Sequence, residues 1–170
     1  EISDIGCNVG QFWKGLKRRD HDQFLYSGFD YEKKYLEAAL NIFPELEGRL
    51  HNHDLTKDSL PDTDITVCSA TIEHLPSLEI GLNDMIKSTR NVILLRTFLG
   101  ESQLTSLNMK QGAKEPYLIH QFSFHDIFSI FSKAGFKVTI IRDKYTDSMP
   151  RYLATGIVRT FYVVKAVREM

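Results

Sequence analysis

Cysteine is scarce in this sequence, whose 170 residues include only Cys7 and Cys68. Two thiols so far apart, with no metal-ligand spacing around them, exclude a disulfide-rich scaffold and a cysteine-based metal site. Such usage is typical of a reducing compartment, and we expect the protein in the cytoplasm. Small thiols of this kind usually pack as hydrophobic side chains rather than act as nucleophiles.

The sequence also lacks an excess of charge and any long apolar run. Lys and Arg number 21 against 22 Asp and Glu, and the formal net charge is −1. We therefore expect no nucleic-acid partner, which would need a basic surface. No apolar run approaches the roughly 18 residues of a membrane-spanning helix, so we expect no membrane partner. The composition is ordinary, and residues 1–170 are predicted to form one globular domain.

A turn bounded by two glycines is the most informative motif that the sequence does contain. It follows a predicted buried strand, residues 1–5, and precedes a predicted helix. Gly6 and Gly10 can take unusual backbone angles and let a ligand approach closely. Such a turn is expected to direct unpaired N–H groups at a polar or anionic ligand head. Asp4, at the end of the strand, suits a cationic group such as a ligand ammonium.

The spacing of the glycines distinguishes between two classes of cofactor. Dinucleotide sites have the pattern G-x-G-x-x-G. Here Gly6 and Gly10 stand four residues apart, with Asn8 between them and Asp4 two residues before the first glycine. This arrangement resembles the first motif, acid-x-Gly-x-x-x-Gly, of the class I S-adenosylmethionine-dependent methyltransferases.

A second acid ends the next predicted strand, residues 24–30. Asp30 lies twenty residues after Gly10, where nucleotide-binding βαβ units have an acid that accepts hydrogen bonds from both ribose hydroxyls. An alternative role for Asp30 is the N-cap of the next predicted helix, residues 31–43. The two roles are compatible, and Asp30 is the strongest single candidate for a cofactor contact.

Two later segments extend the resemblance. Asp54 follows the predicted strand 48–53, and in the family an acid at this place often contacts the adenine amino group; its alternative role is to start a turn. The predicted strand 64–69 leads into a loop containing Glu73 and His74, similar to the segment that follows the fourth strand in this superfamily.

The resemblance covers residues 2–99 in motifs and continues to about residue 168 in the order of elements. It implies S-adenosylmethionine as the cofactor. Relatives usually have a helix before the first strand, so we expect that this sequence lacks an N-terminal helical segment of the domain. The cofactor-binding residues that we expect are Asp4, Gly6, Cys7, Asn8, Gly10, Asp30, Tyr31, Asp54, Leu55 and Ser69.

Strand and helix patterns alternate along the chain. The alternation predicts a doubly wound, Rossmann-like α/β fold with helices on both faces of the sheet. The last two strands follow each other without a helix, which favours antiparallel pairing. We therefore expect a seven-stranded, mostly parallel sheet with an antiparallel C-terminal strand, as the resemblance also implies. The predicted strands are 1–5, 24–30, 48–53, 64–69, 91–98, 136–145 and 156–167, and the predicted helices are 10–19, 31–43, 77–89 and 123–134.

A polar segment of weak periodicity, residues 100–121, follows the fifth of these strands. Loops of this length are usually functional, and we expect a mobile cover over the pocket. Tyr117, His120 and Phe122 are the candidate residues on the substrate side, with packing of the loop as the alternative role. Ser123 opens the next helix with a capping box.

Methyl transfer mainly requires an acceptor lone pair held close to the methyl group and in line with it. A general base is needed only when the acceptor holds a proton of high pKa. His74 and His120 are the candidate catalytic residues, with Glu73 also considered; the alternative role of the Glu-His pair is to hold its loop. No metal site is predicted, because the histidines within residues 51–54 have no fourth ligand.

Three functions remain open at this point. The first is a methyltransferase that uses S-adenosylmethionine to methylate a small-molecule acceptor. The second is a nucleotide-cofactor oxidoreductase, disfavoured by the glycine spacing. The third is a non-catalytic module of the same fold that binds a partner protein. Residues 69–72 read Ser-Ala-Thr-Ile instead of Asn-Pro-Pro-aromatic, which disfavours a DNA base or a glutamine side chain as the acceptor.

Overall fold

The computed structural model describes residues 1–109, 116–153 and 158–169. Its helices are α1 (Gln11–Lys17), α2 (Lys33–Ile42), α3 (Leu78–Ser88) and α4 (Phe124–Lys133), with short 3-10 turns η1 (Pro44–Leu46) and η2 (Ile72–His74). Its strands are β1 (Ile2–Ile5), β2 (Tyr26–Asp30), β3 (Leu50–Asn52), β4 (Thr63–Ser69), β5 (Thr89–Gly100), β6 (Leu104–Asn108), β7 (Tyr117–Ser123), β8 (Phe136–Arg142), β9 (Arg151–Tyr152), β10 (Val158–Arg159) and β11 (Phe161–Arg168).

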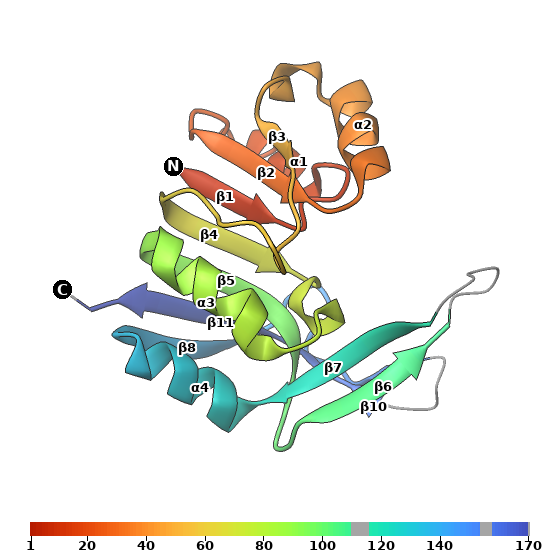
Figure 1. Cartoon of the computed structure of the whole chain (residues 1–170), viewed down its shortest axis with the longest axis vertical. Coiled ribbons are helices and arrows are strands. Elements are labelled where there is room, and N and C mark those ends of the chain that lie inside the picture. The colour runs from red at the N-terminus through yellow and green to blue at the C-terminus, as the bar shows by residue number, and fades with distance from the viewer. Residues whose placement is uncertain (110–115, 154–157, 170) are drawn as a thin grey trace.

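The main sheet has the strand order β3-β2-β1-β4-β5-β11-β8 (Figure 1). The pairs from β3 to β5 are parallel, whereas β11 is antiparallel to both of its neighbours, β5 and β8. The predicted mostly parallel sheet with an antiparallel C-terminal strand is therefore confirmed. The strand order runs one way from β1 to β3 and the other way from β4 to β8, so the carboxyl ends of β1 and β4 flank a switch point, where open α/β sheets bind ligands.

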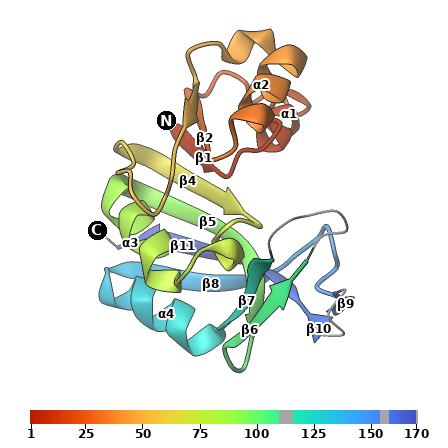
Figure 2. The same cartoon turned by 45° about the vertical axis from the view of Figure 1, so that its right-hand side comes forward.

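Helices cover both faces of this sheet, as predicted (Figure 2). Successive side chains of a strand point to opposite faces, which places Tyr26 and Phe29 of β2 on different sides. Tyr26 packs with Trp13 of α1, whereas Phe29 belongs to the large core with Leu82 of α3 and Phe131 of α4. The structure has no described helix long and apolar enough to cross a membrane.

The polar segment after β5 differs from the predicted loop because part of it forms a hairpin. β6 pairs antiparallel with β7, and β7 joins the end of β5, where Leu99 lies beside Phe122. The pattern escaped sequence analysis because the hairpin buries polar side chains, among them Ser106, Asn108 and Gln121. Residues 110–115, the middle of the predicted cover, lie outside the described residues.

Two predictions about where elements begin can be compared with the structure: the start of α4 after β7, and the start of the last strand. Ser123 accepts a hydrogen bond from the N–H of Asp126 at 3.0 Å, which confirms the predicted start of α4. The predicted last strand is divided into β10 and β11, and β10 pairs with β9 in a small separate sheet. Residues 156 and 157 of that predicted strand lie outside the described residues.

Candidate functional site

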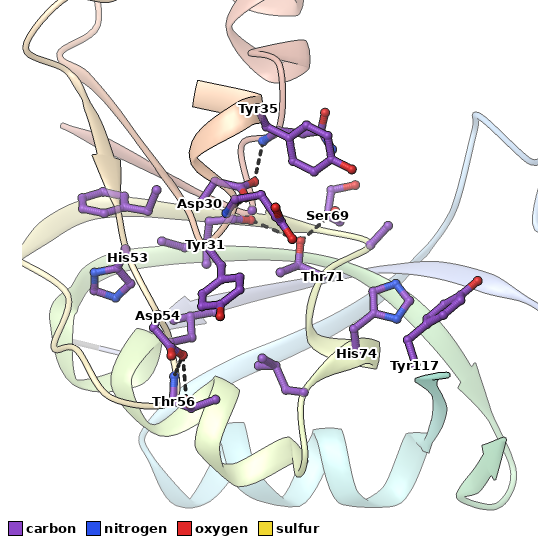
Figure 3. Close-up of a pocket in the computed structure, with 18 of the residues that line it drawn as sticks. Asp30, Tyr31, Tyr35, His53, Asp54, Thr56, Ser69, Thr71, His74 and Tyr117 are labelled. Carbon is purple, nitrogen blue, oxygen red and sulfur yellow. Dashed lines mark hydrogen bonds between the residues drawn. The ribbon is translucent and has the colours of Figure 1, made fainter. Parts of the chain in front are cut away.

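A cavity of about 620 Å³ opens at the carboxyl ends of β1, β2, β3 and β4. This volume is within the range of small-molecule sites, roughly 300–1,000 Å³. Figure 3 shows His74 and Tyr117 at one end of it, Asp54 and Thr56 at the other, and Asp30 between them. The predicted cofactor-binding residues in its wall are Gly6, Asn8, Asp30, Tyr31, Asp54, Leu55 and Ser69, whereas Asp4, Cys7 and Gly10 are not in the wall.

The glycine turn does not have the unpaired N–H groups that we predicted. The N–H groups of Gly6 and Cys7 donate to the carbonyl of Phe29, at 2.8 and 3.1 Å, and that of Gly10 donates to Cys7 at 3.0 Å. The N–H of Asn8 donates to Asp30, and that of the next residue donates to the Asn8 side chain. The prediction was wrong because the turn folds onto the end of β2, and its donors are used there.

The backbone of the turn has the special conformation that its glycines allow. Gly6 has a φ of 71° and Gly10 a φ of 76°, both in the left-handed region that side chains disfavour. A Cβ atom on Gly6 would lie 2.0 Å from Oγ1 of Thr71. The space beside Gly6 is therefore filled by the β4 exit loop.

Asp30 lines the cavity, and both of its carboxylate oxygens accept backbone hydrogen bonds. Its Oδ2 accepts the N–H of Asn8 at 2.8 Å, and its Oδ1 accepts the N–H of Glu32 at 2.9 Å. The bond to Glu32 closes a turn just before α2, but the N-cap of α2 is Glu32 and has no side-chain cap, so the alternative role of Asp30 as N-cap was wrong. Each carboxylate oxygen has two acceptor sites, so one on each oxygen remains for a ligand. Two adjacent hydroxyl groups match such a pair.

Asp54 has the turn role that was its alternative. Its Oδ1 accepts both the N–H of Thr56 at 2.9 Å and the Thr56 hydroxyl at 2.6 Å. The hydrogen bond from Lys57, followed by those from Thr56, lowers the pKa of Asp54 to about 2. Asp54 is therefore ionised at neutral pH and still faces the cavity, which leaves the predicted contact with an adenine amino group as a prediction.

Sequence analysis missed several residues of the cavity wall. His53 lines it, and Nε2 of this ring is buried with no hydrogen-bond partner in the described part of the chain. Its position next to Asp54 was the only available signal. Tyr35 also lines the cavity; it lies in the first turn of α2, and an apolar residue there is normally interpreted as packing the helix on the core.

The exit loop of β4 contains a strained residue in the cavity wall. Ala70 has a φ of 54°, and such a conformation of a non-glycine residue costs on the order of 1–3 kcal/mol. Its N–H donates to the carbonyl of Arg96 at 2.8 Å, which helps to hold it. Strain of this kind is concentrated at functional sites.

His74 and Tyr117 form the end of the cavity farthest from Asp54. Their rings lie 5.4 Å apart in an edge-on arrangement. Nδ1 of His74 lies 2.8 Å from the carbonyl oxygen of Leu118. Because a carbonyl only accepts, Nδ1 carries the proton, and Nε2 is the basic nitrogen of the neutral ring. The hairpin therefore sets the tautomer and the orientation of His74.

His120 does not lie at the cavity, contrary to the expectation from sequence. It is buried, its Nδ1 lies 2.8 Å from the Thr105 hydroxyl, and its ring stacks on Phe122. The reason is the alternation of β7, which directs Tyr117 to the cavity side and even-numbered residues to the other side. Phe122 belongs to the large core, and Glu73 is buried outside the wall.

Asp4 is buried under the turn rather than exposed to a ligand. Its Oδ2 accepts the Tyr26 hydroxyl at 2.8 Å. Burial raises the pKa of Asp4 to about 7, with a smaller lowering effect from Tyr26 and a raising effect from Asp30. Cys7 is also buried, and burial raises the pKa of its thiol, so it stays protonated. No cluster of three or more His, Cys, Asp or Glu residues with the arrangement of a metal site occurs in the described residues.

The raised pKa of Asp4 predicts a specific pH dependence of stability. The unfolded chain has a value near 3.8, so the folded state binds the proton more tightly, and stability falls as pH rises from about 4 to about 7. Asp4→Asn removes this titration while keeping an acceptor for Tyr26. Urea unfolding at pH 5 and pH 7 should show a fall in the free energy of unfolding that is about 2 kcal/mol smaller in the variant. Equal pH slopes would contradict the assignment, since the other titrating groups are common to both proteins.

Comparison with known proteins agrees with the fold. No protein-family model and no curated protein matches this chain. Among solved structures, it is similar to a putative S-adenosylmethionine-dependent methyltransferase from Listeria monocytogenes, with a TM-score of 0.72, 11% identity, and coverage of 99% of this chain and 91% of that one. It is also similar to the magnesium protoporphyrin IX methyltransferase of Synechocystis PCC 6803 with bound S-adenosylmethionine (TM-score 0.64, 18% identity, 99% and 69% coverage).

A third similar structure is that of an amino pentose methyltransferase from Micromonospora echinaspora, also with S-adenosylmethionine bound (TM-score 0.63, 16% identity, 99% and 83% coverage). Identities this low establish the fold alone. The matches span almost the whole chain, and each includes the sheet that forms the cavity. The chain therefore has the fold of the class I S-adenosylmethionine-dependent methyltransferases.

Proposed function

We propose that this chain is an S-adenosylmethionine-dependent methyltransferase that acts on a small-molecule acceptor. The observation that carries the proposal is Asp30, whose carboxylate is fixed by the N–H groups of Asn8 and Glu32 and keeps one acceptor site on each oxygen. It ends β2, the strand next to β1 at the switch point, and lines a cavity of small-molecule size. The fold is the second support.

The residues of the cavity fit this cofactor from one end to the other. Asp30 would hold the two ribose hydroxyls, as an acid does in related nucleotide sites. Asp54 and His53, whose buried Nε2 has no hydrogen-bond partner among the described residues, offer polar groups for a nucleobase, and Tyr31 offers an aromatic surface. Ser69 and the glycine turn remain for the amino acid part. When bound, S-adenosylmethionine supplies an electrophilic methyl group.

His74 and Tyr117 are the groups we assign to the acceptor. Both line the end of the cavity remote from Asp54, where the acceptor would approach. The neutral His74 ring has its basic nitrogen at Nε2, because Nδ1 donates to the carbonyl of Leu118. It can therefore take the proton of a hydroxyl acceptor as the methyl group is transferred. The hydrogen bond to Leu118 in the hairpin fixes the His74 ring, so only an acceptor hydroxyl that lies near Nε2 can give up its proton to it.

The proposal predicts that His74→Ala lowers methyl transfer while the cofactor still binds. The loss should be on the order of 100-fold or more, the usual contribution of a positioned base. Transfer of a labelled methyl group from S-adenosylmethionine to a panel of hydroxyl and amine acceptors measures it, and calorimetry with S-adenosylhomocysteine measures affinity. His125→Ala is the matched control, because His125 is exposed on α4 outside the cavity.

Two outcomes would contradict this assignment. One is an equal loss of turnover and cofactor affinity, which would place His74 in the cofactor site. The other is unchanged turnover with every accepted hydroxyl substrate. Binding of a nicotinamide dinucleotide, without binding of S-adenosylhomocysteine, would favour the oxidoreductase instead.

A further inference from the structure

Arg159 is a buried cation that has no acidic partner among the described residues. Its side chain is 1% exposed, and Nη1 makes a single bond, of 3.3 Å, to the carbonyl of Val158. Nε and Nη2 are buried and have no hydrogen-bond partner in residues 1–109, 116–153 and 158–169. Buried guanidinium groups are normally paired, because the desolvation of an unpaired charge is expensive. A bound anion would compensate the charge of this guanidinium group.

The position of Arg159 relates it to the His74–Tyr117 end of the cavity. It lies two residues before Phe161, which pairs with Phe98 of β5 and stacks on its ring at 3.9 Å. Phe98 and Phe161 form a small cluster to which Ala70 and Tyr117, both in the cavity wall, are packed. The same cluster contacts Leu153, next to β9. The segments on either side of β10 therefore pack against two residues of the cavity wall, and Arg159 lies behind that wall rather than in it.

The residue paired with Arg159 across the β9–β10 ladder is also a cation. This residue is Arg151, and it is exposed. Like charges placed directly opposite each other destabilise a strand pair. On β5, Arg96 stacks on Phe161 with its guanidinium carbon 3.8 Å from the ring centre. Arg96 uses Asp143, at 3.0 Å, for its own ion pair, so this acid does not compensate Arg159.

A purely structural role explains Arg96 better than Arg159. Arg96 and Arg168 have both ring contacts and hydrogen-bond acceptors. For Arg159, the described residues include neither an aromatic ring under the guanidinium nor an acidic partner. Replacing such a group by a neutral one is expected to stabilise a protein that has no use for the charge.

We propose that Arg159, with Arg151, binds an anionic group of the methyl acceptor, either a carboxylate or a phosphate. The proposal rests on the proposed function, which assigns the His74–Tyr117 end of the cavity to the acceptor. Arginine matches both groups because its planar fork donates two parallel hydrogen bonds. The acceptor is then a small acid rather than a neutral sugar or amine.

Thermal unfolding with sodium acetate or inorganic phosphate, against sodium chloride at equal ionic strength, tests the proposal. We expect one of these anions to raise the melting temperature of the wild type and to leave that of Arg159→Gln unchanged. In chloride alone, Arg159→Gln should be at least as stable as the wild type. Arg159→Lys should keep part of the response. Arg142→Gln is the charge-matched control, since Arg142 is exposed and paired with Asp147.

The two anions distinguish the two acceptor classes. A response to phosphate alone favours a phosphorylated acceptor, and a response to acetate alone favours a carboxylic acid. Equal responses in Arg159→Gln and the wild type, or no response in either, would overturn the proposal. So would a loss of stability of Arg159→Gln in chloride, which marks a structural arginine.

The acceptor assay provides the second measurement. For an accepted carboxylic acid and its methyl ester, Arg159→Gln should raise KM for the acid by about tenfold or more, equivalent to about 1.4 kcal/mol, and leave KM for the ester unchanged. Binding of S-adenosylhomocysteine by calorimetry should be the same in both proteins. Failure of the wild type to bind it would overturn the proposed function, whereas the anion titration would still decide the role of Arg159.

Discussion

Asp30→Ala is expected to weaken S-adenosylhomocysteine binding by about 2–4 kcal/mol, because two ribose hydroxyls lose charged acceptors in a desolvated site. The effect has a second source. Asp30 also accepts the N–H groups of Asn8 and Glu32, at 2.8 and 2.9 Å, so its removal leaves the glycine turn and the start of α2 without their common partner. Isothermal titration calorimetry measures the affinity, and circular dichroism shows whether the domain remains folded.

Asp30→Asn separates these two sources. An amide keeps one oxygen acceptor but places a donor opposite the N–H of either Asn8 or Glu32 and removes one acceptor for the ribose, so it should retain only part of the affinity. Asp22→Ala is a matched control for the loss of one acid, since Asp22 is exposed and outside the cavity. If Asp30→Ala binds with unchanged affinity, Asp30 is not the ribose contact, and the central claim about the cavity is lost.

Much of the fold could be predicted because each strand end has its own local signal. Gly6 follows β1, Asp30 ends β2, and Ser123 starts α4, and none of these signals depends on distant contacts. The antiparallel direction of β11 followed from the missing helix between β8 and β11. Such features depend on residues that are close in sequence, and these are the residues that hydrophobic periodicity and turn propensities describe.

The features that escaped prediction depend on pairing between distant segments. The β6–β7 hairpin buries Ser106 and Asn108, so its alternation shows no contrast between apolar and polar residues. Without that hairpin, the choice between Tyr117 and His120 as the residue facing the cavity had no basis. The same holds for Arg159, because the residues placed beside it among those described depend on the register of β10 with β9 and on the packing of β11 on β5.

The N–H groups of the glycine turn also could not be assigned from sequence, because their partners are set by the pairing of β1 with β2. Gly-bounded turns after a strand often leave N–H groups for a ligand. Here the register of β1 with β2 brings the carbonyl of Phe29 under the turn, and it accepts from both Gly6 and Cys7. The proposed cofactor site consequently has fewer free backbone donors in this turn than the motif indicated, and its proposed contacts are made by side chains, above all Asp30.

Gly6→Val is expected to abolish cofactor binding while leaving a folded domain. The glycine motif alone predicts that a branched side chain would fill space meant for the cofactor and strain the turn. The φ of 71° agrees with the strain, and the structure adds a collision, because a Cβ atom would lie 2.0 Å from Oγ1 of Thr71. Either the turn or the β4 exit loop must move. We expect the free energy of unfolding to fall by about 1–3 kcal/mol.

Thr71 makes it possible to separate the collision from the backbone strain. Gly6→Ala has both, whereas Gly6→Ala combined with Thr71→Gly keeps only the strain of the left-handed conformation. If the collision displaces the cavity wall, the double variant should recover part of the affinity for S-adenosylhomocysteine and part of the stability lost in the single variant. Thr71→Gly alone is the control for the loss of the threonine side chain. Movement of Thr71 could relieve the collision, but it would not relieve the backbone strain at residue 6. A folded Gly6→Val protein that binds S-adenosylhomocysteine normally would therefore mean that the turn is not part of the cofactor site.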